Sequence, residues 1–315
     1  MRLRPPLGDF GALFSEGVES DEEFHVRVKH RQRRSAAFHE TPLLRVKRTF
    51  KAAVRLLQPW RLSHLPSTLD LFIREKLVRP SQLPDPRAGL TYAEGLAGLA
   101  ADLTPETMLQ AYSMGLSPSA CLGPVAWHSR EKRWVALPTD VARHMRAHAR
   151  PGEPEWDVAF DRDADTVVAA SGRADSGGSA MPERLLEAFA GLFDAGFAHT
   201  FEVRDNFGRI VGGGFGVAVG RVFVVEAAFE VVRGAGRFGV MALMERLRDW
   251  NFALVERSPG AAWLGGDAFF QMSREDYLES VNRHLVGDAV DGWRADRVAK
   301  PMPRAGWRRL AAQAA

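Results

Sequence analysis

Two glutamates and a serine are the residues in this sequence most suited to chemistry. Glu226 interrupts the apolar run over residues 222–229. A carboxylate in an apolar strand costs free energy unless it is paired or faces a cleft. Glu226 is therefore a candidate catalytic residue, and the alternative is a structural ion pair with an arginine such as Arg237.

Glu256 closes a short apolar stretch over residues 252–256, and Ser258 follows two residues later. In enzymes built on a β-sheet, reactive side chains commonly lie at the end of a strand. Glu256 is thus a candidate general base or amine anchor, with a plain surface acid as the alternative. Ser258 is a weaker catalytic candidate, because serine in Arg-Ser-Pro-Gly also forms turns.

Several neighbouring residues are candidates for binding a substrate. Trp127 and His128 fit either an interface between two lobes or a packed tryptophan beside an incidental histidine. Phe223 and Phe229 fit either a substrate pocket or the core. Three further positions complete the substrate-binding candidates: Gly214, Met181 and Trp263.

The elements that must position these residues lie within residues 198–258. Alternation of apolar and polar residues predicts strands, and turn residues predict where they end. In chain order the pattern predicts a strand over 198–204, a hairpin turn at 205–208, a strand from 210, a tight turn at 220–221, a strand to 229, a helix over 237–250 closed by Asn251, and a strand over 252–256.

This order of three strands, a helix and a strand is typical of acyltransferases of the GNAT type, in which a splayed sheet holds an activated acyl donor. Three consecutive glycines at 212–214 lie inside the second strand. Glycine weakens a strand, so the run indicates a bulge or the close approach of a ligand or another backbone. The alternative is that the glycines let the helix pack tightly on the sheet.

Capping residues and periodicity predict the remaining elements. A helix over 103–115 has Thr104 as its cap, Pro105 at its first position and Gly115 at its end, with Met108, Leu109 and Tyr112 as a buried stripe. The others are a loop over 116–124, strands over 125–128 and 134–138, an edge strand over 155–161, a helix over 163–171, a flexible loop at 175–179, a helix from Pro182 to Gly196, and a helix after a capping box at Ser273 and Asp276 that runs to Leu285.

Composition describes a globular chain of 315 residues, 46% hydrophobic and 26% charged, with a net charge of +3. Residues 26–62 are strongly basic, and Glu40 is their one acid. A basic patch suits a polyanion such as nucleic acid, and a solvated face or an arm that pairs with acidic protein is the alternative. Residues 44–58 fit an amphipathic helix, for which an acidic membrane surface ranks below those partners.

One cysteine and nine scattered histidines predict neither disulfides nor a metal site. No signal peptide or membrane span is predicted, so we expect a cytoplasmic monomer without a membrane partner. Composition divides the chain into a basic N-terminal extension (1–90), a small N-terminal lobe (91–150), a transferase domain (151–285) and a basic tail (286–315), with a linker over 79–91.

Four segments together resemble the leucyl/phenylalanyl-tRNA–protein transferase family. They are residues 102–115 (DLTPETMLQAYSMG), 198–203 (AHTFEV), 211–220 (VGGGFGVAVG) with Glu226, and 242–252 (ALMERLRDWNF). The resemblance implies an α+β, GNAT-like mixed sheet flanked by helices. It also implies transfer of an amino acid of the leucine or phenylalanine type from tRNA to a protein's N-terminal amine, without a metal or dissociable cofactor. Proteins marked in this way are degraded.

The family's functional positions are partly retained. The glutamate of its "ESMF" motif falls on Glu226, and a pocket phenylalanine falls on Phe223. Its "DCQ" motif falls on residues 256–258, where a carboxylate remains at Glu256 but Ser258 replaces the amide. The resemblance places the ester carbonyl beside strand 222–229, with Glu256 taking or positioning the amine proton.

The aromatic positions that hold the terminal adenosine of tRNA in the family are changed. They fall on residues 117–120 and 178–181, and neither segment contains tryptophan. Base–aromatic stacking contributes roughly 1–3 kcal/mol per base. Trp127, at the family's "WW" position, and Trp263 are possible substitutes.

Two other functions stay open at this point, and the first is a GNAT acyltransferase that uses acyl-CoA on a small amine. Residues 233–239 resemble the pyrophosphate loop of GNAT enzymes that use acyl-CoA, although Phe238 stands where a small residue is expected. A family relic that binds peptide or RNA is the third reading, which the lost amide and tryptophans favour. All enzymatic readings require Glu226 and Glu256 on the same side of the sheet.

Overall fold

The computed structural model describes residues 32–56, 82–89, 95–120, 124–147, 156–174, 180–263 and 266–285, with the isolated positions 66, 70 and 73. The chain divides into two compact units, residues 1–39 and 40–315. The described part of the first unit contains a helix over residues 32–38. All elements named below belong to the second unit.

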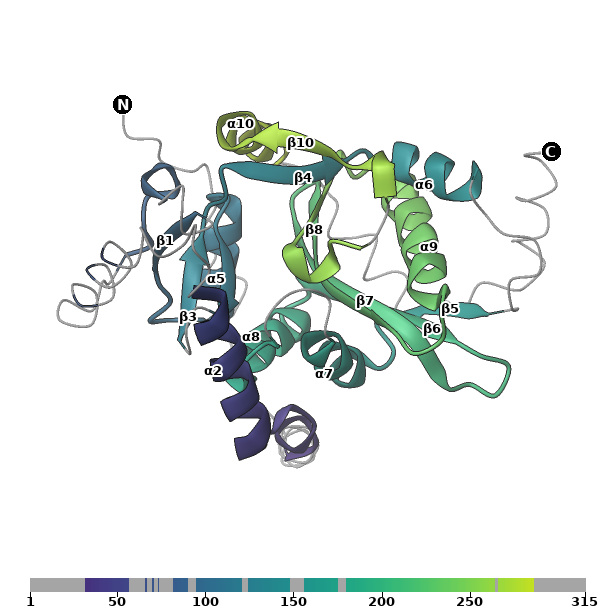
Figure 1. The fold of residues 1–315 in the computed structure, drawn as a ribbon. Helices are drawn as coiled ribbons and strands as arrows, with labels where there is room; N and C mark the ends of the chain where they lie inside the picture. The colour runs from purple at the N-terminus through teal and green to yellow at the C-terminus, as the bar shows by residue number, and fades with distance from the viewer. Residues whose placement is uncertain are drawn as a thin grey trace, which may run out of the picture. The chain divides into compact units, whose positions relative to one another are not determined.

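A seven-stranded mixed sheet forms the centre of the second unit (Figure 1). Its strand order is β10-β4-β9-β8-β7-β6-β5. Neighbouring strands are antiparallel except β8 and β9, which are parallel. The strands are β4 (Lys132–Ala136), β5 (Asp157–Phe160), β6 (Ala198–Arg204), β7 (Ile210–Val219), β8 (Val222–Glu230), β9 (Leu254–Arg257) and β10 (Phe270–Ser273).

Two tight turns join the three long strands β6, β7 and β8, as the sequence predicts. After β6, the carboxylate of Asp205 accepts the backbone N–H of Arg209 at 2.9 Å, and Gly208 has a φ of 77°. Between β7 and β8, Gly220 has a φ of 56°. This left-handed backbone favours glycine at both turns.

Helices cover both faces of the sheet (Figure 1). The helix α9 (Ala235–Asp249) lies on one face beside α6 (Pro138–Ala147), and α7 (Ala164–Arg173) and α8 (Glu183–Asp194) lie on the other. Between α9 and the sheet, Phe201, Phe223 and Leu243 belong to one buried core. On the other face, Phe189 of α8 packs edge-on against Phe215 with ring centroids 4.9 Å apart. The fold is the mixed α+β sheet flanked by helices that the sequence predicts.

Glycines let α9 approach the strands β6 and β7 closely. A Cβ atom on Gly212 would lie 2.8 Å from the Cβ of Ala235, and one on Gly239 would lie 2.7 Å from Val203. Carbon atoms do not pack at such distances, so larger residues would push the helix away from the sheet. The tight-packing interpretation of the glycine run is correct for Gly212.

A three-stranded antiparallel sheet, ordered β1-β3-β2, accompanies the helix α5 (Pro105–Ser113). Its strands are β1 (Leu96–Leu99), β2 (Ser117–Ala120) and β3 (Val125–His128). Thr104 caps α5 as predicted, because its hydroxyl accepts the N–H of Thr107. The predicted loop over 116–124 is wrong for residues 117–120, which form the strand β2. Proline at position 118 is tolerated because β2 lies at the edge of its sheet, where a missing N–H breaks no hydrogen bond to a further strand.

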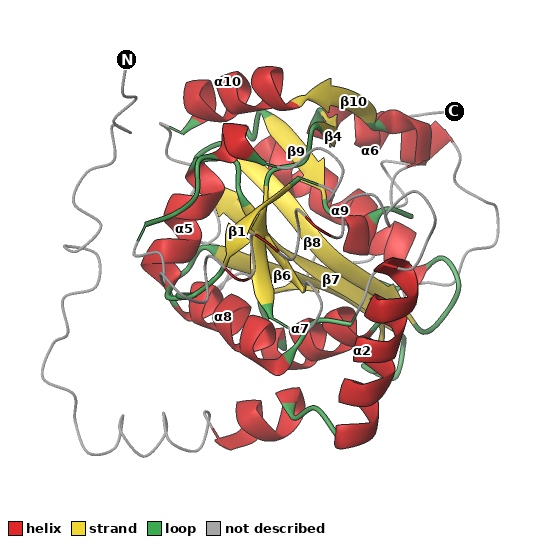
Figure 2. Cartoon of the chain, turned by 60° about the vertical axis from the view of Figure 1, so that its left-hand side comes forward, coloured by secondary structure: helices red, strands yellow, loops and turns green. Residues whose placement is uncertain are grey.

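The remaining elements complete the described chain (Figure 2). Ser273 caps α10 (Arg274–His284) by accepting the N–H of Asp276 at 3.1 Å, as predicted. The others are α2 (Pro42–Leu56) and the short 3-10 helices η2 (Pro86–Ala88), η4 (Pro259–Ala261) and η5 (Gly266–Ala268). No helix in the described ranges is long and apolar enough to cross a bilayer.

The predicted boundaries at residues 90, 150 and 285 stay predictions. The strand β4 and the helix α6, which precede residue 150, belong to the large sheet and the layer that covers it. The predicted flexible loop at 175–179 and the basic tail over 286–315 lie outside the described residues.

Replacing Gly220 with alanine should lower the free energy of unfolding by about 3 kcal/mol, through left-handed backbone strain together with overpacking. A Cβ atom there would meet the carbonyl oxygen of His284 and lie 2.7 Å from the Cα of Leu285. Gly208→Ala is the matched control, because its φ is 77° and nothing lies within 4 Å of the added atom. It should cost only about 1 kcal/mol. Urea denaturation measures both, and equal losses would contradict the packing of this turn on α10.

Candidate active site

A bulge in β8 places Glu226 in the candidate site. Ala227 pairs with Phe215, but Val225 pairs with Gly216, so Glu226 is an extra residue without a partner across the ladder. Val225 and Ala228 both enter the core beneath α9. A regular strand would place residues three apart on opposite faces, and the bulge removes that alternation.

Gly216, the residue of β7 opposite the bulge, leaves the space that the bulge needs. A Cβ atom on Gly216 would meet the carbonyl oxygen of Val224 and the ring of Phe223. The sequence predicts a bulge at the glycine run itself, whereas this bulge lies in the facing strand β8, opposite Phe215 and Gly216. Within the run, a Cβ atom on Gly213 would lie 2.6 Å from the Phe201 carbonyl oxygen, which is the predicted close approach of another backbone.

The carboxylate of Glu226 receives two hydrogen bonds from distant parts of the chain. The phenol of Tyr112, on α5, donates to Oε1 at 2.6 Å, and the hydroxyl of Ser258, just after β9, donates to Oε2 at 3.1 Å. All three residues are buried. These neutral donors are the partners that the structure gives Glu226, in place of the ion pair with Arg237 considered from the sequence.

Burial raises the pKa of Glu226 from 4.5 to about 7, and the nearby charge of Glu256 acts in the same direction. The hydrogen bonds from Tyr112 and Ser258 favour the ionised form and act against this shift. Burial, and then the charge of Glu226, raise the pKa of Tyr112 well above 10, so the phenol keeps its proton. Glu226 can therefore exchange a proton near neutral pH.

Glu256 is buried and paired with a cation, so it is not the surface acid that the sequence allowed. Nη1 of Arg133, on β4, donates to its Oε1 at 2.8 Å, and Nη2 donates to the carbonyl of Gly115. The guanidinium lies over the ring of Tyr277, on α10, 4.5 Å from its centroid. Burial, and then the charge of Glu256, raise the pKa of the Tyr277 phenol well above 10.

Glu226 and Glu256 lie on the same face of the sheet. In the parallel pair β8–β9, Val224 is opposite Glu256, and Ser258 follows two residues later. Side chains two residues apart on a strand share a face, and Ser258 reaches Glu226. The carboxylate cluster, by which we mean Tyr112, Arg133, Glu226, Glu256, Ser258 and Tyr277, is thus assembled from five elements and their ends.

The structure therefore brings together the three catalytic candidates, Glu226, Glu256 and Ser258. Sequence reasoning missed Tyr112, Arg133 and Tyr277 as members of the cluster. Tyr112 had one usable signal, since a buried tyrosine needs a partner for its hydroxyl. Arg133 and Tyr277 had none, because nothing local places β4 and α10 beside Glu256.

Three other candidates pack within the protein. Phe223 lies in the core beneath α9, edge-on to Phe252 with ring centroids 6.0 Å apart, and not beside Glu226. A Cβ atom on Gly214 would meet the ring of Phe201, so this glycine makes room for a side chain. Phe229 is buried against Gly213, in the part of β8 beyond the bulge.

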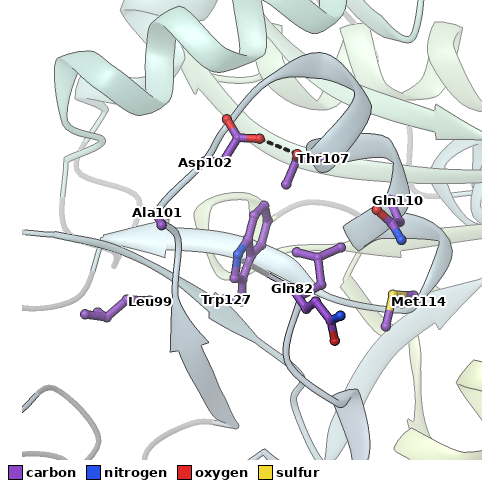
Figure 3. Close-up of a pocket in the computed structure, with 9 residues that line it drawn as sticks. Gln82, Leu99, Ala101, Asp102, Thr107, Gln110, Met114 and Trp127 are labelled. Atoms are coloured by element: carbon purple, nitrogen blue, oxygen red, sulfur yellow. Dashed lines mark hydrogen bonds between the residues drawn. The ribbon is translucent and has the colours of Figure 1, made fainter. Parts of the chain in front are cut away.

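Trp127 lines a cavity of about 420 Å³ beside α5, together with Asp102, Thr107, Gln110 and Met114 (Figure 3). Thr107, Gln110 and Met114 share one face of α5, and Tyr112 points from the opposite face. The cavity and the carboxylate cluster thus lie on opposite sides of this helix.

His128 adjoins Trp127 on β3. Its Nδ1 lies 3.2 Å from both the Ser119 hydroxyl and the Ala126 carbonyl. Burial, and then the charge of Arg130, lower the pKa of His128 to about 3, so the ring is neutral at pH 7. Met181, in contrast, lies at the connection between α7 and α8, where its N–H donates to the carbonyl of Gly172 at 2.8 Å.

The loop resembling a pyrophosphate site is already occupied by the protein. The N–H groups of Gly234 and Gly236 donate to the carboxylate of Glu230 at 3.0 and 3.3 Å. The ring of Trp263 lies where a Cβ atom on Gly236 would be. A phosphate at this end of α9 would have to displace a carboxylate, which disfavours the acyl-CoA hypothesis. The same contact places Trp263 at α9, away from the carboxylate cluster.

A family model and individual relatives of known name point to the same protein family. A family model described as leucyl/phenylalanyl-tRNA protein transferase matches residues 135–282. The leucyl/phenylalanyl-tRNA–protein transferase of Stutzerimonas stutzeri (strain A1501) is 31% identical over 217 residues, which cover 67% of this chain and 95% of the relative. That of Nitrosospira multiformis is 31% identical over 64% of this chain and 88% of the relative.

One solved structure, a tandem GNAT protein from the clavulanic acid biosynthesis pathway, matches with a TM-score of 0.25 and 14% identity. The match covers 55% of this chain and 53% of that chain. A likeness this low carries no argument about fold or function.

Protein stability should depend on the titration of Glu226. Because its pKa is higher in the folded protein, the native state binds more protons than the unfolded state between pH 4.5 and about 7. The free energy of unfolding should therefore fall as pH rises through this window, by on the order of 3 kcal/mol. Glu226→Gln should remove that fall, as measured by urea denaturation across the window. Glu187→Gln, at an exposed position on α8, is the control and should retain it. An unchanged slope in Glu226→Gln would contradict the assignment.

Proposed function

Because the chain belongs to the leucyl/phenylalanyl-tRNA–protein transferase family, we propose that it transfers an amino acid of the leucine or phenylalanine type from an aminoacyl-tRNA to the N-terminal amine of a protein. The family assignment rests on relatives about 31% identical, matched over most of their own length. The observation that carries the chemistry is the buried carboxylate of Glu226, with a pKa of about 7.

The proposed reaction is aminolysis of an ester. The amine nitrogen of the acceptor forms a bond to the ester carbonyl carbon, and the bond from that carbon to the ribose oxygen breaks. The amine loses a proton as it attacks, and the leaving ribose oxygen takes up a proton. A base that accepts the first proton and returns it to the oxygen balances the reaction without an oxidant, a reductant or water.

We assign this base to Glu226 rather than to Glu256, which the family resemblance suggested. An ideal base titrates near the working pH, and Glu226 does so. Glu256 instead forms a buried ion pair with the Arg133 guanidinium, with Nη1 of Arg133 2.8 Å from its Oε1. In this proposal Glu256 assists, because its charge adds to the effect of burial in raising the pKa of Glu226.

Tyr112 and Ser258 act as positioning residues for Glu226. Each donates to a different oxygen of the carboxylate, which fixes its orientation toward the amine. Ser258 stands at the family's glutamine position. In this proposal its shorter side chain supplies, through the hydroxyl group, the hydrogen bond that this position makes to Glu226.

We place the 3′ end of the tRNA at the edge formed by β2. This strand covers the first of the two segments, 117–120 and 178–181, that correspond to the family's adenosine-binding positions, and it contains no aromatic residue. Arg130 is half-buried at this edge and donates to the Ser117 hydroxyl at 3.1 Å. Its charge also lowers the pKa of Glu226, so it lies near the reacting groups. A phosphate contact by Arg130 would partly compensate for the missing stacking.

The pH dependence of transfer tests the base assignment. The rate of leucine transfer from leucyl-tRNA to a peptide beginning with arginine should rise with pH. Tyr112→Phe should move the midpoint of this rise upward, because it removes a hydrogen bond to the ionised carboxylate. Glu256→Gln should move it downward, because it removes a like charge. Shifts in the same direction would contradict the assignment.

Glu226→Gln completes this experiment. Without a base, transfer should fall by about 100-fold or more at pH 7.5, while circular dichroism shows an intact fold. If the variant retains full activity, the carboxylate is structural. If the wild-type protein transfers nothing from either charged tRNA, the proposed function is wrong and the relic reading stands.

Arg130→Gln tests the donor site. Loss of a charged phosphate contact should raise the KM for aminoacyl-tRNA about tenfold, measured at pH 8.5, where Glu226 is ionised in either protein. Arg143→Gln, at an exposed position on α6, is the control and should leave the KM unchanged. An equal KM in both variants would remove Arg130 from the donor site.

A further inference from the structure

The helix α2 exposes an apolar stripe along its length. Leu43, Val46, Phe50 and Val54 follow one another at spacings of three or four residues, which places them on one face of the helix. Their exposed fractions are 78%, 66%, 68% and 49%. Folded proteins usually cover a continuous apolar stripe of this kind, so its exposure indicates an interaction surface.

The opposite face of α2 is held by the protein. Arg48 is buried, and its guanidinium donates to both carboxylate oxygens of Glu40 at 2.8 and 3.0 Å. The backbone N–H of Glu40 donates in turn to the carboxylate of Glu183, on α8, at 3.3 Å. Arg48 is two residues from both Val46 and Phe50, which is more than half a turn away. The contact with Glu40 therefore directs the apolar stripe away from α8.

The charge of α2 narrows the choice of partner. Its sequence has no acidic residue and five basic ones: Arg45, Lys47, Arg48, Lys51 and Arg55. Two such helices would repel each other, which disfavours a second copy of this chain. Leu43, Val46 and Val54 are aliphatic and give RNA nothing to hydrogen-bond or stack upon. This leaves Phe50 as the one residue of the stripe for stacking and disfavours nucleic acid as the occupant of the stripe. A bilayer with anionic headgroups offers both an apolar layer in which the stripe can be buried and negative charges that attract the basic residues.

We propose that α2 binds the surface of an anionic lipid bilayer, with its apolar stripe among the acyl chains and Lys47, at the edge of the stripe, at the headgroups. The helix lies on the bilayer and does not cross it. This surface lies outside residues 135–282, which match the family, and it is independent of the transfer reaction. From the sequence, a membrane ranks below nucleic acid as the partner of this segment. The exposure of the apolar stripe reverses that ranking.

The test is co-sedimentation of the full-length protein with vesicles. We expect binding to phosphatidylcholine vesicles that contain phosphatidylglycerol, and about tenfold weaker binding to pure phosphatidylcholine. Binding should also weaken as the salt concentration rises from 0.1 to 0.5 M. The double variant Val46→Glu with Phe50→Glu should reduce binding at least about tenfold, with circular dichroism showing that the fold is intact.

Phe207→Glu is the matched control, because Phe207 is 83% exposed at the turn after β6 and should not affect vesicle binding. Equal loss in both variants would overturn the proposal, and so would no binding to anionic vesicles. It is also overturned if the double variant loses tRNA binding but keeps vesicle binding. Transfer to a short peptide in solution should not change in the double variant, so failure of the proposed reaction and failure of membrane binding are separate results.

Discussion

A carboxylate removed from water must find hydrogen-bond donors or take up a proton. Glu226 receives two hydrogen bonds and also has a raised pKa. Its donors come from α5 and from the end of β9, so they reach it only after these elements have packed on β8. The same burial that demands the donors raises its pKa to about 7. The candidate site therefore depends on a local loss of hydration that would destabilise the fold if the donors were missing.

The two glutamates of the carboxylate cluster have different environments, which is the basis of the different roles proposed for them. Glu226 is surrounded by neutral hydroxyl groups, whereas Glu256 shares a buried ion pair with Arg133. Environments that separate two carboxylates in this way commonly divide catalytic roles between them. Arg133 also binds the carbonyl of Gly115, at the end of α5, so it joins the large sheet to the segment that carries Tyr112. The ion pair with Glu256 and the packing of α5 near the sheet are thus linked at one side chain.

Small residues determine where the sheet can bend and where a helix can pack closely on it. Gly216 allows the bulge that re-aims Glu226, and Gly212 lets α9 pack against β7. At the start of α9, however, Glu230 already accepts the exposed N–H groups. The scaffold that suits acyl transfer is therefore present, while the helix end that would suit a diphosphate is occupied by the protein's own carboxylate.

The sequence alone determined the strands β6, β7 and β8, the turns at Gly208 and Gly220, the caps of α5 and α10, and the three residues Glu226, Glu256 and Ser258. These features are local: they follow from side-chain period, glycine conformation and the cost of a charge among apolar residues. It missed β2, where the loop-forming residues gave no sign that an edge strand would accept Pro118. Only the tertiary structure decided that Tyr112, Arg133 and Tyr277 surround the carboxylates, because contacts between residues more than 100 positions apart leave no periodic trace in the chain. It also decided that the pKa of Glu226 is raised, since burial and neighbouring charge belong to the packed protein and not to the residue type.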